Sequence, residues 1–393
     1  MRLSVTQSHT VLAGGPCRVR LVQGDATIFG YHMRRNVNVV ARPWRILPIH
    51  AVTDSELEVE VGEGGTVTTV DRDTIPDGWK DLASTLEEDR RVLILGSTDS
   101  GKTSLATYLY NNALSRSKRV ILVELDTGQS EMCPPTTMGV ALSSTPVYDL
   151  YNLRPNVIYP FGYTSSQLDV RGSLKVASTV AEGLPRGLVI IDSDGWVMDE
   201  GAALHKTAIV DTFKPSDVVI LGDVGFMDAL SELGDRLGFE LHLLDRPTAI
   251  SKRRVEDRRD LRVMNYTRYL SGSSLRSIPR NWSSVEIVVS HFSELTYEEY
   301  IGWAIEELRS SGRIIMNGVI GVQSLDTSRL GIGIISYLYG PTGAFESLGL
   351  FMGSDKNFLR VFTPYRGPIS LIKLGGVVLS RDFEEVHVLR VPP

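Results

Sequence analysis

The sequence contains only two cysteines and no long apolar segment. Cys17 and Cys133 lie far apart, and neither belongs to a CxxC pair or stands beside a histidine, which excludes the usual zinc-binding spacings. No uncharged apolar run approaches the roughly 18 residues that a membrane span needs, and the N-terminal MRLSVTQSHT lacks the apolar core of a secretory signal. We therefore expect a cytoplasmic protein with two free thiols, although the sequence alone also allows one disulfide between them.

The sequence also has no excess of positive charge. The 393 residues include 41 Lys and Arg against 47 Asp and Glu, which gives a formal net charge of −6. This balance argues against a general electrostatic attraction to nucleic acid, so any site for a polyanion must come from a local basic patch. The composition, 42% hydrophobic and 22% charged, excludes collagen-like, coiled-coil and disordered classes. A chain of this length predicts two or three domains.

Both ends of the chain show β patterns. Residues 1–72 contain short alternating runs separated by Gly and Asp turn signals, which predicts a small N-terminal β domain, a sandwich or a barrel. Residues 314–393 return to β patterns, beginning with GVIGVQS at 318–324, and predict a C-terminal β domain. Residues 73–89 predict a short helical join, with Pro76 near its first turn. Its apolar face would contain Trp79, Leu82, Ala83 and Leu86.

Between residues 90 and 313, apolar β runs alternate with helical patterns. The β runs fall at 92–95, 120–125, 187–192, 217–222 and 285–290, and the helices at about 101–115, 201–213, 226–237, 250–269 and 295–311. Continuous apolar strands separated by helices are typical of a parallel sheet that is covered on both faces. We therefore expect an α/β domain with a mainly parallel sheet over residues 90–313.

The strongest motif is GSTDSGKT at residues 96–103, directly after the first of these apolar runs. The G-x4-G-K-T pattern at a strand-to-helix turn is typical of a P-loop, in which backbone N–H groups surround a phosphate at a helix N-terminus. In such a loop Lys102 would reach the β- and γ-phosphates, and the Thr103 hydroxyl would bind Mg²⁺. The candidate nucleotide-binding residues are Gly96, Ser97, Thr98, Asp99, Ser100, Gly101, Lys102, Thr103 and Ser104.

The sequence lacks the additional motifs that define two classes of P-loop protein. A guanine-specific GTPase would show N/T-K-x-D, but no lysine here is followed by aspartate two positions later. A transporter ATPase would show LSGGQ, whereas residues 270–274 read LSGSS. The class that remains is the small kinases, which combine a strand-end aspartate beside the P-loop with an arginine-bearing lid.

Carboxylates follow two of the predicted strands. Asp126 comes directly after the run 120–125 and opens the sequence DTGQ, while the run 187–192 ends in DSDGW at 192–196. The carboxyl ends of parallel strands face the ligand crevice, where Asp126 could accept a proton or hold Mg²⁺ through water. The alternative is a turn or helix cap, which is a stronger candidate for Asp192 and Asp194 because Asp-Gly is a common turn pair.

Basic residues concentrate in one helical segment, the predicted arginine-rich lid at about 250–269. Its cations between 252 and 268 are Lys252, Arg253, Arg254, Arg258, Arg259, Arg262 and Arg268. Guanidinium groups on such a segment could neutralise a phosphoryl group in transfer, or bind the phosphates of a polynucleotide. The remaining alternative is a solvated helix face with ion pairs along it.

The P-loop, ELDTGQ, DSDGW and the segment SKRRVEDRRDLR together resemble the polynucleotide 5′-hydroxyl-kinase family, and the resemblance covers most of the chain. It implies ATP- and Mg²⁺-dependent phosphorylation of 5′-hydroxyl ends of RNA, sometimes of DNA, in RNA processing. The implied catalytic residues are Asp126, Lys102, Arg259 and Arg262, and the implied acceptor contacts are Gln129, Ser193, Trp196 and Arg258. Ser193 replaces the family's threonine, and Met264 stands where related chains often have another arginine.

Two other functions remain open at this point. The chain could be an ATP-binding scaffold that organises an RNA-processing complex with little turnover, or a P-loop kinase for a small molecule. Trp196 could stack on a nucleic-acid base, or it could pack within the protein. The sequence does not decide between RNA and DNA, which lid arginine contacts the γ-phosphate, or the oligomeric state.

Overall fold

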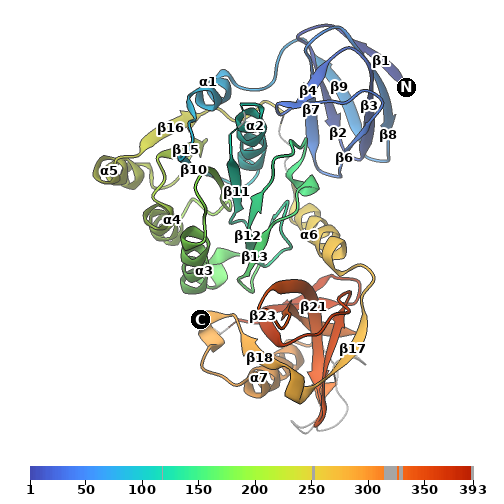
Figure 1. Ribbon diagram of the computed structural model, residues 1–393, viewed down its shortest axis with the longest axis vertical. Helices are drawn as coiled ribbons and strands as arrows, with labels where there is room; N and C mark the ends of the chain where they lie inside the picture. Colours follow the sequence, from blue (N-terminus) through green and yellow to red (C-terminus); the bar gives the residue numbers. More distant parts are fainter. Residues whose placement is uncertain (117, 250–252, 314–324, 327–330, 391–393) are drawn as a thin grey trace. The chain divides into compact units, whose positions relative to one another are not determined.

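The computed structural model describes all residues except 117, 250–252, 314–324, 327–330 and 391–393 (Figure 1). The chain forms two compact units, which are described separately. The first comprises Met1–Glu124, Val140–Asn156 and Gly183–Asp257, and the second Leu125–Gly139, Val157–Glu182 and Arg258–Pro393. Among the described residues, no helix is both long enough and apolar enough to cross a membrane. Both cysteines are buried free thiols.

The first 70 residues form two antiparallel sheets. One contains β1 (Arg2–Val5), β8 (Ser55–Val61), β3 (Cys17–Gln23) and β6 (Asn38–Ala41). The other contains β5 (Tyr31–His32), β4 (Ala26–Ile28), β7 (Ile46–Ala51), β2 (Thr10–Gly14) and β9 (Thr66–Val70). Side chains alternate along β3, so that Cys17, Val19 and Leu21 are buried in one apolar core. The predicted N-terminal β structure is therefore confirmed, as two sheets that share a core.

The predicted join forms helix α1 (Asp77–Thr85), with Pro76 at its N-cap position. Trp79, Leu82 and Ala83 are buried, as their helical spacing predicts. The indole N–H of Trp79 donates to the Asp245 carbonyl over 3.0 Å, which satisfies the polar edge of a fully buried ring. Trp79 thus ties the join to a loop of the α/β part of the same unit.

A parallel sheet forms the centre of the first unit. The sheet has seven strands, and the five that lie wholly in this unit pair in the order β11 (Val120–Glu124), β14 (Leu188–Asp192), β10 (Arg91–Gly96), β15 (Asp217–Leu221) and β16 (Glu240–Leu244). Every residue of β11, β14 and β15 is buried, which explains why these strands appear in the sequence as continuous apolar runs. The register pairs Ile94 with Asp192, so the carboxyl ends of β10 and β14 lie at the same edge.

Helices cover both faces of this sheet (Figure 1). Helix α2 (Lys102–Ser115) connects β10 to β11 in one direction across the sheet, whereas α4 (Glu200–Phe213) and α5 (Met227–Leu237) make connections in the opposite direction. Because parallel crossovers are right-handed, connections in opposite directions place their helices on opposite faces. The predicted α/β fold with a mainly parallel sheet is therefore confirmed.

The second unit is built on a sheet of mostly antiparallel strands. Its order is β17 (Ser274–Pro279), β22 (Phe358–Thr363), β21 (Phe345–Ser354), β20 (Ile332–Tyr339), β23 (Leu371–Ser380) and β18 (Ser284–Ile287), with β19 (Leu325–Asp326) beside β21 and β24 (Glu385–Val388) beside β23. The remaining strands and α-helices of the chain are β12 (Thr137–Leu142), β13 (Val157–Pro160), α3 (Val170–Glu182), α6 (Val255–Leu270) and α7 (Tyr297–Ser310), of which β12 and α6 have residues in both units.

One strand expectation was wrong, and another cannot be compared. The run 285–290, expected in the parallel α/β sheet, forms β18, which pairs with β23 in the C-terminal sheet. A short apolar run carries no information about which sheet it joins, because the strand partner depends on the whole topology. The predicted run at 318–324 lies outside the described residues.

Candidate active site

The loop between β10 and α2 has the conformation that its glycines predict. Gly101, at the N-cap of α2, has a φ of +100°, a backbone conformation that side chains disfavour. A Cβ at Gly101 would also lie 2.8 Å from Cδ of Pro247, so this position has no room for one. Two separate constraints, conformation and space, therefore favour glycine here.

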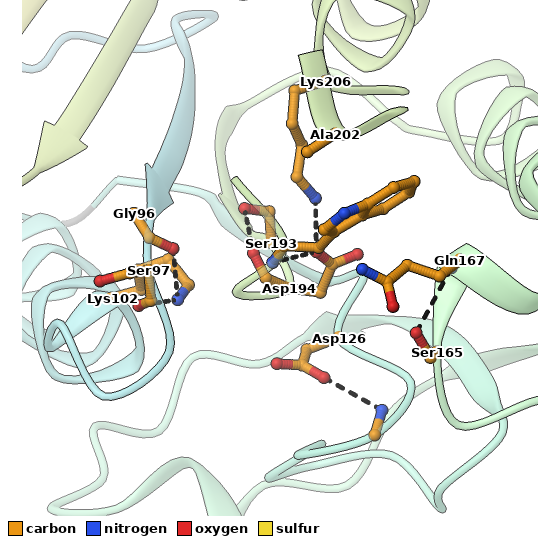
Figure 2. A network of polar contacts seen from close by, with 12 residues as sticks. Gly96, Ser97, Lys102, Asp126, Ser165, Gln167, Ser193, Asp194, Ala202 and Lys206 are labelled. Carbon is orange, nitrogen blue, oxygen red and sulfur yellow. Dashed lines mark hydrogen bonds and ion pairs between the residues drawn. The ribbon is translucent and has the colours of Figure 1, made fainter. Parts of the chain in front are cut away.

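The lysine of this loop is turned inward. Nζ of Lys102 donates to the carbonyl oxygens of Gly96 at 2.9 Å and Ser97 at 3.0 Å, and the residue is only 7% exposed (Figure 2). The ammonium group is thus held in the loop at the N-terminus of a 14-residue helix. Backbone N–H groups, a helix N-terminus and a buried cation are the features that a polyphosphate-binding site needs.

Thr103 has a carboxylate partner at the adjacent strand end. Its Oγ1 donates to Oδ2 of Asp192 over 2.7 Å, and Asp192 is almost fully buried. A hydroxyl and a carboxylate are the hard oxygen ligands that Mg²⁺ accepts, so these residues fit the predicted metal. Asp192 thereby joins Thr103 as a candidate metal residue, and its turn-forming alternative loses support.

The DSDGW segment after β14 is fixed by side-chain contacts within the first unit. The buried Ser193 hydroxyl donates to the Ile94 carbonyl over 2.7 Å and links the ends of β14 and β10. Oδ1 of Asp194 accepts from the Trp196 backbone N–H at 2.9 Å and from Nζ of Lys206 at 2.7 Å (Figure 2). These bonds hold the segment 192–196, here called the clasp, in one conformation.

The charges under the clasp are strongly perturbed. Burial opposes ionisation of Asp194, but the charge and hydrogen bond of Lys206 lower its net pKa. Burial and the neighbouring Lys206 ammonium lower the pKa of His205 to about 4. Near neutral pH the clasp therefore rests on an Asp194–Lys206 ion pair beside a neutral imidazole.

The indole of Trp196 contacts two other residues of the protein, one through its N–H group and one beside its ring. Its indole N–H donates to Oδ2 of Asp199 over 2.7 Å, and its ring centroid lies 5.5 Å from that of His205. These contacts favour the interpretation in which the tryptophan packs within the protein.

In the second unit, the DTGQ segment forms a turn that is held by hydrogen bonds to the Asp126 side chain. Oδ1 of Asp126 accepts from the backbone N–H groups of Gly128 at 3.0 Å and Gln129 at 2.8 Å, which orients the carboxylate. The Gln129 amide donates weakly to the Arg258 carbonyl of α6 over 3.4 Å. The structure thus brings together Asp126, Gln129 and Arg258 of α6 within this unit.

The two predicted catalytic arginines have carboxylate partners on the C-terminal strand region. Arg262 makes a bidentate pair with Glu385, at 2.6 Å and 3.0 Å, while Arg259 lies 3.3 Å from Glu384 in a more exposed pair. The later part of α6 is not a detached flap, because Tyr266 and Leu270 are fully buried. Lys252 and the rest of 250–252 lie outside the described residues.

Comparison with known proteins agrees with these motifs. A family model, "mRNA cleavage and polyadenylation factor CLP1 P-loop", matches residues 96–272, the stretch that contains the P-loop, the clasp and the lid. This stretch, a little under half of the chain, is similar to the CLP1 P-loop family. The resemblance inferred from the motifs is therefore confirmed.

Individual relatives extend over more of the chain. The Arabidopsis thaliana protein CLP1 homolog 5 is 27% identical over 65% of this chain and 67% of its own. A polyribonucleotide 5′-hydroxyl-kinase of Pyrococcus horikoshii is 29% identical over 78% of this chain and 90% of its own. A Methanocaldococcus jannaschii protein of the same name is 27% identical over 49% of this chain, and the match spans only 53% of that protein.

A solved structure of wild-type Clp1p in complex with Pcf11p has the same fold. It superposes with a TM-score of 0.67 at 15% identity, covering 95% of this chain and 97% of that chain. Both β regions and the α/β centre therefore occur together in an experimentally determined structure.

Proposed function

We propose that this protein is an ATP- and Mg²⁺-dependent polynucleotide 5′-hydroxyl kinase that transfers the γ-phosphoryl group to the 5′-hydroxyl of RNA, with DNA as a second candidate acceptor. The observation that carries the proposal is the inward-turned Lys102 beside the Thr103–Asp192 pair. The DTGQ turn of the second unit holds the Asp126 carboxylate in a fixed orientation, which suits the acceptor role proposed for it. The names of the archaeal relatives support the same reaction.

The donor half of the reaction uses the P-loop. Loop N–H groups and Lys102 bind the β- and γ-phosphates of ATP and stabilise the charge that develops there. Thr103 and Asp192 would hold the Mg²⁺ ion, which when bound neutralises charge on the phosphate oxygens. Nζ of Lys102 would exchange the carbonyl oxygens of Gly96 and Ser97 for phosphate oxygens, a change confined to the loop itself.

The acceptor half of the reaction uses Asp126. The 5′-hydroxyl oxygen forms a bond to the γ-phosphorus, the bond to the β–γ bridging oxygen breaks, and ADP leaves. The hydroxyl proton passes to the Asp126 carboxylate. Arg259 and Arg262 neutralise the phosphoryl group in transfer, and Gln129, Ser193 and Arg258 are the proposed contacts to the polynucleotide end. Trp196 is assigned to packing of the clasp instead, because its indole N–H and ring already have protein partners.

A second candidate is an ATP-binding scaffold with little turnover. The observation that favours it is that Arg259 and Arg262 already have glutamate partners, so their guanidinium groups would have to exchange partners to serve catalysis. The structural neighbour Clp1p is described in complex with Pcf11p, so we also propose that this chain has protein partners in RNA processing.

End labelling of RNA separates these possibilities. Wild-type protein with γ-labelled ATP should label a 5′-hydroxyl oligoribonucleotide, while Lys102→Ala and Asp126→Asn should abolish the labelling. Lys102→Ala should also weaken ATP binding, whereas Asp126→Asn should leave it within about threefold, because that carboxylate acts on the acceptor. Tight ATP binding with no labelled RNA would favour the scaffold, and labelling of free nucleosides would favour a small-molecule kinase.

A further inference from the structure

Arg246, in the loop after β16, is held close to the P-loop by fixed neighbours. The carbonyl of Asp245 accepts the Trp79 indole N–H over 3.0 Å, and Pro247 lies against Gly101, where a Cβ would be only 2.8 Å from the proline ring. The residues on both sides of Arg246 are therefore anchored. Its backbone position relative to the P-loop is set before any ligand binds.

The guanidinium group of Arg246 lies over Gly222 at the end of β15. A Cβ at Gly222 would be 2.5 Å from Cζ of Arg246, and closer still to its Nε and Nη2. Gly222 also has a φ of +80°, so both conformation and space disfavour a side chain there. A glycine at this strand end thus leaves room for a planar guanidinium group.

The hydrogen-bonding capacity of Arg246 is directed to the P-loop and is otherwise unused within the described part of the chain. Its Nη2 donates to the Ser97 hydroxyl over 3.2 Å, and Arg246 makes no ion pair with a carboxylate among the described residues. The lid arginines differ, since Arg259 and Arg262 face Glu384 and Glu385. An arginine has five N–H donors, so most of those on Arg246 can still bind an anion or a polar ligand.

The strand order indicates which end of the nucleotide Arg246 would contact. The P-loop follows β10, with β14 on one side and β15 and then β16 on the other. Thr103 and Asp192, the candidate metal residues, lie on the β14 side, where the γ-phosphate and the acceptor must meet. The nucleoside end of ATP therefore extends toward the β15–β16 side, where Gly222 and Arg246 lie.

We propose that Arg246, supported by Gly222, is a nucleotide-binding residue that contacts the nucleoside diphosphate part of ATP. The inference rests on the nucleotide-binding half of the proposed function and does not require RNA as the acceptor. Because ATP and ADP share this part, Arg246 should bind both equally and should contribute to KM rather than to kcat. This separates it from Arg259 and Arg262, whose proposed role is at the transferring phosphoryl group.

Nucleotide binding without RNA tests the proposal directly. Arg246→Ala should raise the dissociation constants of fluorescent ATP and ADP analogues by the same factor, roughly 10-fold to 100-fold for a charged hydrogen bond. Arg236→Ala, which removes an exposed arginine from the end of α5, is the matched control and should change neither constant. Gly222→Ala should weaken both nucleotides as well, because the new Cβ displaces the guanidinium group.

Three results would overturn the proposal. They are unchanged binding of both nucleotides by Arg246→Ala, loss of ATP affinity with ADP unaffected, or an equal loss in the Arg236→Ala control. Arg246→Lys is the control for a folding defect. It retains the positive charge but lacks the planar guanidinium group, so it should weaken the binding of both nucleotides less than Arg246→Ala does. Failure of RNA labelling with normal nucleotide binding would count against the proposed kinase function and not against Arg246.

Discussion

Gly195 gives the sharpest steric test of how the clasp positions the P-loop. A Cβ at this position would lie 2.7 Å from the backbone N of Thr98 and 2.8 Å from its Cα, and closer still to its Oγ1. Ordinary contact begins at 3.4 Å, so Gly195→Ala must move the Thr98 backbone by about 0.7 Å or displace the clasp by a similar amount. Gly195 does not have a left-handed φ, so alanine adds crowding without backbone strain.

The expected effect is larger on activity than on stability. Displacing a phosphate-binding loop by about 0.7 Å should lower kcat/KM by roughly 10-fold to 100-fold. The overpacking itself should cost about 1–3 kcal/mol of the free energy of unfolding. The clasp cannot easily yield instead, because the Asp194–Lys206 ion pair and the Ser193 hydroxyl hold it.

RNA labelling, nucleotide binding and urea unfolding should be measured on the same preparations. Gly302→Ala is the matched control, because Gly302 lies in α7 with nothing within 4 Å of an added Cβ, and alanine there should stabilise the helix slightly. Adding Thr98→Ala to Gly195→Ala removes the hydroxyl contact but leaves both backbone contacts, so activity should recover only in part. Full activity of Gly195→Ala alone, or complete recovery in the double variant, would refute the reasoning.

Three further predictions concern ion pairs. Burial opposes ionisation of Asp217, but hydrogen bonds from His242, Arg90 and Ser216 outweigh it and lower the pKa of Asp217 from 3.8 to about 2. The ionised carboxylate therefore stabilises the folded state above pH 3.8, and this stabilisation is lost as the pH falls toward 2. Asp217→Asn should remove about 2 kcal/mol of this pH dependence from the free energy of unfolding measured in urea. Lys206→Met should lower the free energy of unfolding by about 3–5 kcal/mol because it leaves Asp194 buried without its ion-pair partner, and adding Asp194→Asn should restore much of the loss; no recovery would contradict this assignment. Glu385→Gln should lower the free energy of unfolding, measured in urea, by about 2 kcal/mol, because its ion pair with Arg262 is largely buried. Glu384→Gln, in the more exposed pair with Arg259, should lower it by less than about 0.5 kcal/mol, and equal losses would contradict this difference.

Local patterns predicted the elements that depend on neighbouring residues. The turn between β10 and α2 follows from its glycines, and the buried strands follow from apolar runs. Helix α3 was missed because its sequence, VRGSLKVASTVAE, mixes glycine and β-branched residues with helix formers. The apolar run at 285–290 was correctly expected to be a strand, but its sheet partner depends on residues about 90 positions later in the chain.

The functional contacts that escaped prediction are tertiary. No local pattern pairs Thr103 with Asp192, Arg262 with Glu385, or Arg246 with Ser97, because each pair is separated by many residues along the chain. Lys206 did leave a signal, since it occupies a core position of α4 at helical spacing from buried Ala202 and Ile209. A lysine at such a position needs a buried partner, and Asp194 is that partner.

The most direct test of the central claim uses one RNA in two forms, identical except for a 5′-hydroxyl or a 5′-phosphate. With γ-labelled ATP and Mg²⁺, the wild-type protein should label only the 5′-hydroxyl form, and nuclease digestion should place the label on the 5′-terminal nucleotide. Asp126→Asn should bind ATP and label neither form. Absence of label from both RNAs, with wild-type protein that binds ATP, would contradict the assignment of this chain as a polynucleotide 5′-hydroxyl kinase.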